Sequence, residues 1–157
     1  MTDKTQQKGL MRGFTIMEVL IVIAIISITA VMSTPFLSAT LSRSELDIAA
    51  EGAVDALEEA RSSALNGRGS GQFGVHFEPD QYVFFDSGTY SAVDPNNFVR
   101  SLSGYVSISS INISDGGNDI IFASASGEPN QTGTIVFTDS SGATKTVTVN
   151  SAGTVDY

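Results

Sequence analysis

The chain has 157 residues, no cysteine and a formal net charge of −9. This length suits one globular domain with an anchor rather than two globular domains. Without cysteine, the chain has no disulfide or thiolate chemistry. Its acidic balance disfavours attraction to phosphate backbones, so nucleic acid is not an expected partner.

An apolar segment, Gly13 to Met32, lies near the start of the chain and reads GFTIMEVLIVIAIISITAVM. As a helix, Phe14 to Met32 would be roughly 28 Å long, close to the roughly 30 Å of a bilayer hydrocarbon core. Glu18 is the exception, because a charge there costs on the order of 2.5 kcal/mol or more unless it is neutralised or paired. We therefore expect a membrane-spanning helix in which Glu18 has a special role.

The charges around this segment predict its orientation. Lys4, Lys8 and Arg12 precede it with only Asp3 against them, whereas the rest of the chain has 5 basic and 16 acidic side chains. Basic residues tend to stay on the cytoplasmic side of a membrane. The leader is therefore expected in the cytoplasm, and everything after Met32 on the other side.

A second helical pattern follows Pro35, a residue that either kinks and locally opens the helix or ends it. Apolar residues then recur at spacings of three and four and form a narrow stripe suited to packing on a sheet. The stripe consists of Leu46, Ala49, Ala50, Ala53, Leu57, Ala60 and Ala64. Acidic residues between Glu45 and Glu59 occupy much of the opposite face, which we interpret as solvated. The Asn66-Gly67 pair predicts the end of this helix.

Short β-branched and aromatic runs dominate the chain after Asn66, where 12 of the 15 glycines also lie. These runs predict strands at 73–77, 81–85, 105–108, 111–113, 119–122, 133–138 and 144–149, with an edge strand at 154–157. Turns at Pro79-Asp80 and Ser140–Gly142 predict two hairpins. A loop rich in Asp, Asn and Gly separates the first hairpin from the later strands.

Together these patterns predict an α+β fold, in which a long N-terminal helix packs on a C-terminal antiparallel β-sheet domain. The expected parts are a leader at 1–13, a transmembrane helix at 14–35, an amphipathic helix at 36–66 and the β domain at 67–157. The residues expected in the core are Ala53, Leu57, Phe73, Val75, Tyr82, Phe84, Ile135, Phe137, Val147 and Val149.

The string from Gly13 to Glu18, GFTIME, resembles the prepilin signature of type IV pilins and type II secretion pseudopilins. The resemblance implies cleavage by a prepilin peptidase between Gly13 and Phe14, followed by N-methylation of Phe14. Glu18 would be the fifth mature residue, and Pro35 would be the twenty-second, where the family commonly has proline. Over the β domain the chain is similar to H-type minor pseudopilins and FimT-type minor pilins.

This resemblance implies a structural subunit, and a minor one, of a type IV pilus or a type II secretion pseudopilus. Its implied partners are the prepilin peptidase, other pilin or pseudopilin subunits, the inner-membrane assembly platform and, before assembly, membrane lipid. The protein would cross the bacterial inner membrane once with its β domain outside, and would then join a periplasmic or cell-surface filament. No cofactor is implied.

Three residues are candidates for a role in subunit assembly. After cleavage, the Phe14 ammonium of one subunit could pair with Glu18 of another and so fix their register. Pro35 would let the subunit fit the filament core. Glu18 could instead be a tolerated polar residue near the headgroups, and Pro35 a plain helix terminator.

Other readings of the N-terminus and of the function remain open. The apolar segment could be an uncleaved signal anchor, or a secretory signal cut after Met32. The chain could also be a pilus-tip subunit for adhesion or DNA uptake. FimT-type subunits imply DNA binding through basic residues near the C-terminus, but Ser151 to Tyr157 contains neither Lys nor Arg.

An enzyme is not expected, because no nucleophile, acid/base pair or metal-binding set is visible. His76 is the sole histidine and is interpreted as a solvent-facing strand residue. Residues Asp115 to Asp119 offer closely spaced oxygens, but they lack the fuller ligand ladder of a calcium motif. They are interpreted as an ordinary turn, and no metal site is predicted.

Overall fold

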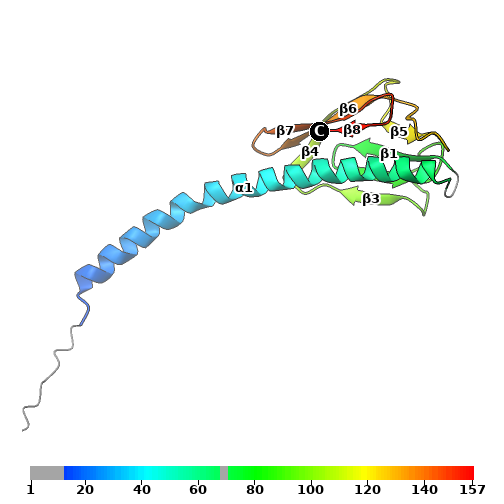
Figure 1. Ribbon diagram of the computed structural model, residues 1–157. Helices are drawn as coiled ribbons and strands as arrows, with labels where there is room; N and C mark the ends of the chain where they lie inside the picture. The colour runs from blue at the N-terminus through cyan, green and yellow to red at the C-terminus, as the bar shows by residue number, and fades with distance from the viewer. Residues whose placement is uncertain (1–12, 68–70) are drawn as a thin grey trace, which may run out of the picture. The chain divides into compact units, whose positions relative to one another are not determined.

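The computed structural model describes residues 13–67 and 71–157, and of residues 31–39 it describes the helical backbone alone. The chain divides into two compact units, residues 1–38 and 39–157, which are taken separately. One long helix, α1 (Ile16–Leu65), precedes the strands (Figure 1). The strands are β1 (Phe73–Glu78), β2 (Gln81–Phe85), β3 (Phe98–Ser101), β4 (Val106–Ile113), β5 (Asp119–Phe122), β6 (Gly133–Asp139), β7 (Thr144–Val149) and β8 (Val155–Asp156).

Helix α1 ends where the sequence predicts, one residue before Asn66. The Asn66 side-chain amide donates to the carbonyl of Ser62 at 2.7 Å, and Gly67 takes a positive φ of 62°. Gly67 tolerates this left-handed conformation because it has no Cβ. All seven residues of the predicted Ala-rich stripe are buried.

Over the described residues, 13–67 and 71–157, no helix is both long enough and apolar enough to cross a membrane. The predicted transmembrane segment, 14–35, ends within residues 31–39. The side chains of those residues lie outside the described part of the chain. The predicted leader also lies outside it, apart from Gly13.

The strands form two four-stranded antiparallel sheets rather than one continuous sheet. The first sheet has the order β3-β2-β1-β5. Its β1–β2 hairpin turns at Pro79-Asp80, as predicted, and places Phe77 opposite Tyr82. Strand β3 was not predicted, because all four of its residues are exposed and show no alternation of burial.

The second sheet has the order β4-β6-β7-β8. It contains the predicted β6–β7 hairpin, and β8 lies at its edge, as the sequence indicates. The prediction of separate strands at 105–108 and 111–113 is wrong. They form the single strand β4, whose register against β6 shifts at a bulge between Ile108 and Ser110. A bulge inserts an extra residue without ending the strand, so the sequence alternation breaks while the pairing continues.

One core joins the C-terminal part of α1 to both sheets (Figure 1). Small alanines on the helix allow close approach to large strand residues, including Phe77, Phe122 and Phe137, which are fully buried. Every predicted core residue is buried except Phe84, which is half-buried and packs against the core.

The opposite face of the first sheet is also covered. Val83, Phe85 and Ile121 are buried there, although they point away from the main core. Gly74 lies between the last two in register, and a Cβ at Gly74 would come within 2.5 Å of the Phe85 ring. Tyr90, from the loop between β2 and β3, packs against Phe85 with ring centroids 5.6 Å apart. This second face therefore holds a small cluster of its own.

Candidate functional site

The predicted cleavage site is open. Gly13 precedes α1, and among the described residues beyond its chain neighbours no atom lies within 4 Å of the position that a Cβ would occupy. The side chain of Phe14 is 83% exposed. This stretch is not helical, and no described residue packs over the Gly13–Phe14 peptide bond.

Thr15 caps the N-terminus of α1. The backbone N–H of Glu18 donates to Thr15 Oγ1 at 3.2 Å, and the N–H of Val19 donates to the Thr15 carbonyl at 3.2 Å. Thr15 and Glu18 thus have the spacing of a capping box, in which an acid at the third helical position also favours the positive end of the helix dipole. Glu18 lies in the exposed first turn of the helix.

Ser27 and Thr29 interrupt the apolar run, but their hydroxyls are satisfied within the helix. Ser27 Oγ donates to the carbonyl of Ile23 at 2.7 Å, and Thr29 Oγ1 lies 3.0 Å from the carbonyl oxygens of Ile25 and Ile26. Such bonds to preceding carbonyls let hydroxyls sit in an apolar environment. The large apolar side chains between Phe14 and Ile28 are exposed in the isolated chain.

Pro35 lies inside α1, which continues for 30 residues to Leu65, so its interpretation as a helix terminator is wrong. The side chain of Pro35 lies outside the described part of the chain. Its predicted role in assembly remains a prediction, as do those of Phe14 and Glu18.

His76 is not the solvent-facing residue that the sequence indicates. Its side chain is 15% exposed, and Nδ1 lies 2.5 Å from Asp119 Oδ1 while Nε2 lies 3.3 Å from Glu78 Oε1. The Tyr90 ring stacks on the imidazole with centroids 3.8 Å apart. Burial, followed by the charges of Glu78 and Asp119, raises the pKa of Tyr90. Each ring nitrogen of His76 thus contacts one carboxylate, and the two contacts fix the orientation of the ring.

Within the described residues, no group of three or more His, Asp or Glu side chains could hold a metal ion. The Asp115–Asp119 segment is a turn, in which the N–H of Gly117 donates to Asp115 Oδ1 at 2.9 Å. Asp119 is engaged with His76. The oxygens that suggested a calcium site therefore serve the turn and the neighbouring sheet.

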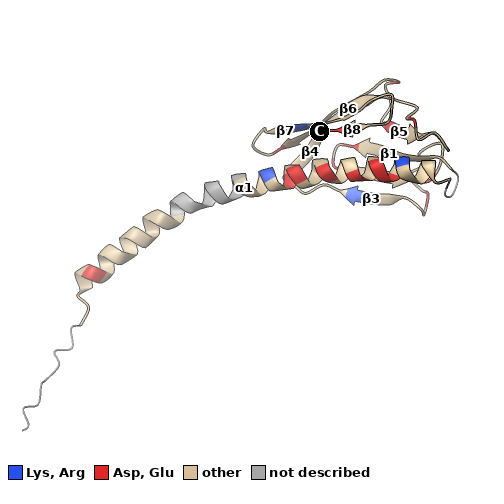
Figure 2. Cartoon of the chain, viewed as in Figure 1, with Lys and Arg blue, Asp and Glu red and all other residues tan. Residues whose placement is uncertain are grey.

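The acidic face of α1 is partly tied to the second sheet. Acidic residues lie along the C-terminal part of the helix (Figure 2). Asp47 Oδ1 lies 2.8 Å from Lys145 Nζ, and Glu51 accepts a hydrogen bond from the Tyr157 hydroxyl at 3.2 Å. Lys145 also lies over the Tyr157 ring, 4.8 Å from its centroid. The acid pair raises the pKa of both Lys145 and Tyr157, mainly through these hydrogen bonds.

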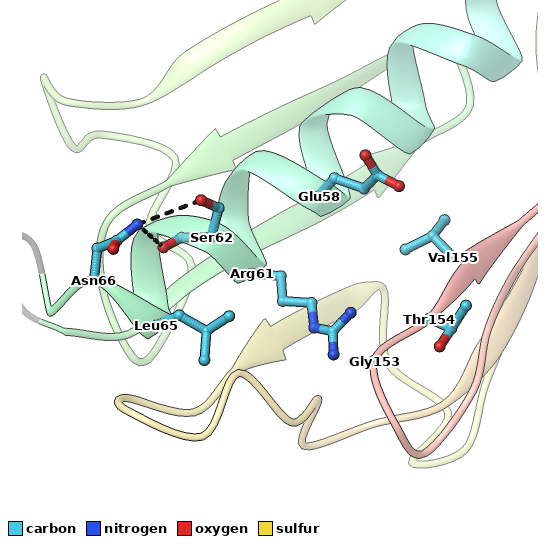
Figure 3. Close-up of a pocket in the computed structure, with 8 residues that line it drawn as sticks. All are labelled: Glu58, Arg61, Ser62, Leu65, Asn66, Gly153, Thr154 and Val155. Carbon is cyan, nitrogen blue, oxygen red and sulfur yellow. Dashed lines mark hydrogen bonds between the residues drawn. The ribbon is translucent and has the colours of Figure 1, made fainter.

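A pocket of about 350 Å³ opens between the end of α1 and the C-terminal strand (Figure 3). Glu58, Arg61, Ser62 and Leu65 line it from the helix, and Thr154 and Val155 line it from the other side. The Arg61 guanidinium lies between the two walls. Sequence reasoning missed this site, because the two loops that meet Arg61 lie more than 60 residues further along the chain.

The capping role of Thr15 had a detectable signal in the sequence, whereas the burial of His76 under Tyr90 had none. The Thr-x-x-Glu spacing of Thr15 and Glu18 predicts a helix start without any family knowledge. The burial of His76 depends on Tyr90, from a loop without regular structure, and no local pattern predicts where such a side chain folds back.

A comparison with protein families matches residues 49–153 to the family described as Type II transport protein GspH. No curated protein and no solved structure matches the chain significantly. The match spans more than half of the chain and covers the C-terminal part of α1 and the strands up to β7. The long helix followed by antiparallel sheets agrees with it. The chain therefore belongs to the GspH family of type II secretion pseudopilins.

Proposed function

We propose that this protein is a minor structural subunit of a type II secretion pseudopilus and has no catalytic activity. The family match over residues 49–153 carries the proposal. It also favours a secretion pseudopilus over a type IV pilus. The Gly13–Glu18 signature lies outside the matched residues and independently supports a prepilin-like subunit, but it is shared by type IV pilins and secretion pseudopilins and does not distinguish between them.

Processing is the first step of the proposed function. A prepilin peptidase would cut between Gly13 and Phe14, and the new N-terminal Phe14 would be methylated. The open backbone at Gly13 supports this step, because a peptidase must reach the scissile bond.

Before assembly, the segment 14–35 would anchor the subunit in the inner membrane, with the β domain in the periplasm. Two observations support this proposal. The apolar side chains of the described part are exposed in the isolated chain, and the hydroxyls of Ser27 and Thr29 bond to the helix backbone. Polar groups must be satisfied internally in lipid.

Assembly would move the same helix from lipid into a bundle of neighbouring helices. The Phe14 ammonium of one subunit would then face Glu18 of the next, and two charges would be neutralised together. Other pseudopilins and the assembly platform of the inner membrane would be the partners in this step.

Intact-mass measurement tests the processing step. The full chain is expressed in a host with an active prepilin peptidase, extracted from the membrane and weighed. We expect a mature chain that begins at methylated Phe14. Gly13→Val should block the cut, because the family peptidase acts after glycine, and Gly13→Ala should slow it.

Gly9→Val is the matched control, since it makes the same change within the leader but away from the bond. A wild-type chain that keeps residues 1–13 would overturn the proposed processing. So would normal cleavage of Gly13→Val.

A further inference from the structure

The pocket at the end of α1 contains the cation of Arg61, which has no counter-ion among residues 13–67 and 71–157. Arg61 Nε donates to the carbonyl of Gly127 at 3.2 Å, and Nη2 donates to the carbonyl of Ala152 at 3.0 Å. Both acceptors are neutral. Among the described residues, no carboxylate lies within ion-pair distance of Arg61, although such pairs are found at His76 and Lys145.

Glycines, which have no side chain, stand at the two positions where the loops approach this guanidinium. Gly153 is buried with a positive φ of 74°, and a Cβ there would lie 3.0 Å from Arg61 Nε and 2.8 Å from the carbonyl oxygen of Gly127. Gly127 also has a positive φ, of 63°. Two glycines therefore bring the loops close enough to hold one edge of the guanidinium.

The rest of the guanidinium is available to a ligand. Arginine has five N–H donors in a planar fork, and the bonds to the Gly127 and Ala152 carbonyls leave the outer part of the fork without a protein acceptor among the described residues. Figure 3 shows the guanidinium inside the pocket, between the helix and Thr154. A fork of this kind matches a carboxylate in bidentate geometry.

The residues that line the pocket restrict the charge, polarity and size of a ligand that could bind there. Leu65 and Val155 provide apolar surface, and Ser62 and Thr154 provide hydroxyls. Glu58 lines the same pocket and disfavours a second negative charge. The volume of about 350 Å³ lies at the small end of the range for ligand pockets.

From this arrangement we propose that the Arg61 pocket binds a monoanionic carboxylate carried on an apolar stem, as at the end of a peptide or on an acidic side chain. The carboxylate takes the free donors of Arg61, and the stem lies against Leu65 and Val155. This binding goes beyond the structural role proposed above and requires neither processing nor assembly of the chain.

The test uses the full chain in a non-ionic detergent and nuclear magnetic resonance titration. The reporters are the Arg61 side-chain Nε–H and the backbone amides of Gly127 and Gly153. The probes are acetyl-alanyl-leucine with a free carboxylate, the amide of the same dipeptide, acetyl-glutamate amide and inorganic phosphate. We expect saturable shifts with the free acid and at least about tenfold weaker binding of its amide.

The two carboxylate probes distinguish the two sources. Tighter binding of acetyl-alanyl-leucine would assign the pocket to a chain end, and tighter binding of acetyl-glutamate amide would assign it to an acidic side chain. Either result supports the proposal. Phosphate binding as tight as that of both carboxylates would overturn it in favour of a free oxyanion.

Variants at two neighbouring glutamates separate binding from folding. Glu58→Gln removes the negative charge from the pocket wall and should tighten binding of the free acid about two- to threefold. Glu59→Gln is the matched control, an exposed acid on the same helix that does not line the pocket. Arg61→Lys keeps the charge but loses the fork, so it should weaken binding by at least about fivefold. Equal shifts with acid and amide, or equal affinities of the two glutamate variants, would overturn the proposal.

Discussion

Close packing at single residues explains features of this sequence that composition alone leaves unexplained. Gly52 lies in the middle of α1, where glycine costs about 1 kcal/mol relative to alanine. A Cβ at this position would lie 2.5 Å from the Tyr82 hydroxyl oxygen. Tyr82 is buried in the core, and burial raises its pKa. Glycine is therefore needed where a strand tyrosine meets the helix.

We expect Gly52→Ala to lower the free energy of unfolding by up to about 2 kcal/mol, because overpacking costs about 1–3 kcal/mol and the gain in helix propensity offsets about 1 kcal/mol of it. Tyr82→Phe removes the clashing oxygen. In that background the same alanine should be neutral or stabilising. Urea unfolding of the four proteins in a non-ionic detergent measures the cycle, and an equal effect of Gly52→Ala in both backgrounds would contradict the packing argument.

The His76 cluster supports a second prediction. His76→Gln leaves the carboxylates of Glu78 and Asp119 without their shared partner, and Asp119→Asn weakens the 2.5 Å contact from the other side. Each change should cost about 1–2 kcal/mol of unfolding free energy. The double variant should cost less than the sum, because both changes remove one interaction.

Asp80→Asn is the control, because it removes a negative charge from an exposed turn. It should leave the free energy of unfolding almost unchanged. Strict additivity of His76→Gln and Asp119→Asn in the unfolding measurements would show that the two side chains do not support each other.

At the scale of the element, the sequence predicts helices and strands that have a periodic apolar pattern. It misses strands whose formation depends on pairing with a neighbouring strand. The helix end at Asn66 and both hairpins follow from local turn chemistry and periodicity, and the structure confirms them. Strand β3 depends on its pairing with β2, since all four of its own residues are exposed. The bulge in β4 interrupts the sequence alternation, so the pattern predicts two strands where the structure has one. The division of the strands into two sheets has no signature in the sequence of any single strand.

The β6–β7 hairpin is held together by Asp139, which is 5% exposed. Asp139 Oδ1 accepts hydrogen bonds from the Ser141 hydroxyl at 2.7 Å, from the Ser141 N–H at 2.8 Å and from the Ala143 N–H at 2.9 Å. These bonds, led by the Ser141 hydroxyl, lower the pKa of Asp139. The charged carboxylate is the form that the turn stabilises.

A lowered pKa in the folded state fixes the sign of the pH dependence. The stabilisation is present above the ordinary aspartate pKa of about 3.9 and is lost as the pH falls through the lower value of the folded state. We expect Asp139→Asn to be less stable than wild type at pH 7, with the gap closing below about pH 4. Urea unfolding between pH 7 and pH 3 measures this. A gap that is constant over the whole range would show that charge at Asp139 does not matter.

At the scale of the whole molecule, the N-terminal signature is easier to recognise in the sequence than the sites on the β domain. The residues from Gly13 to Glu18 are contiguous, so the motif can be recognised in the sequence without knowledge of the fold. The Arg61 pocket and the His76 cluster join segments more than 40 residues apart and depend on the completed sheets. The family match rests on the end of α1 and on the β domain, whereas the roles of the N-terminal signature in processing and assembly stay predictions.

We predict that Glu18 links one side chain to assembly of the filament, and the cap that it forms with Thr15 offers a way to test this role. Glutamine at the third helical position also suits a capping box, so Glu18→Gln keeps the start of α1 intact while removing the charge. Thr15→Val makes the opposite change, because it removes the capping hydroxyl and keeps the charge of Glu18. The pair of variants separates helix capping from charge pairing.

If Glu18 pairs with the Phe14 ammonium of a neighbour, Glu18→Gln leaves that ammonium unpaired in an apolar bundle. Loss of one partner of a buried pair costs about 3–5 kcal/mol, which would reduce incorporation into filaments by two or more decades. Membrane insertion should survive or improve, since no acid has to enter lipid. Cleavage should also survive, because the Gly13–Phe14 bond lies outside the changed turn.

The measurement compares membrane-fraction level, N-terminal mass and filament-fraction level for wild type, Glu18→Gln and Thr15→Val. Charge pairing predicts that Glu18→Gln is processed normally but absent from filaments, while Thr15→Val loses about 1 kcal/mol of helix stability and still assembles. If Glu18→Gln assembled normally, the pairing role would be rejected. If Thr15→Val failed and Glu18→Gln did not, the capped helix start would be the feature that assembly requires. Loss of Glu18→Gln from the membrane fraction would place the role of Glu18 at insertion.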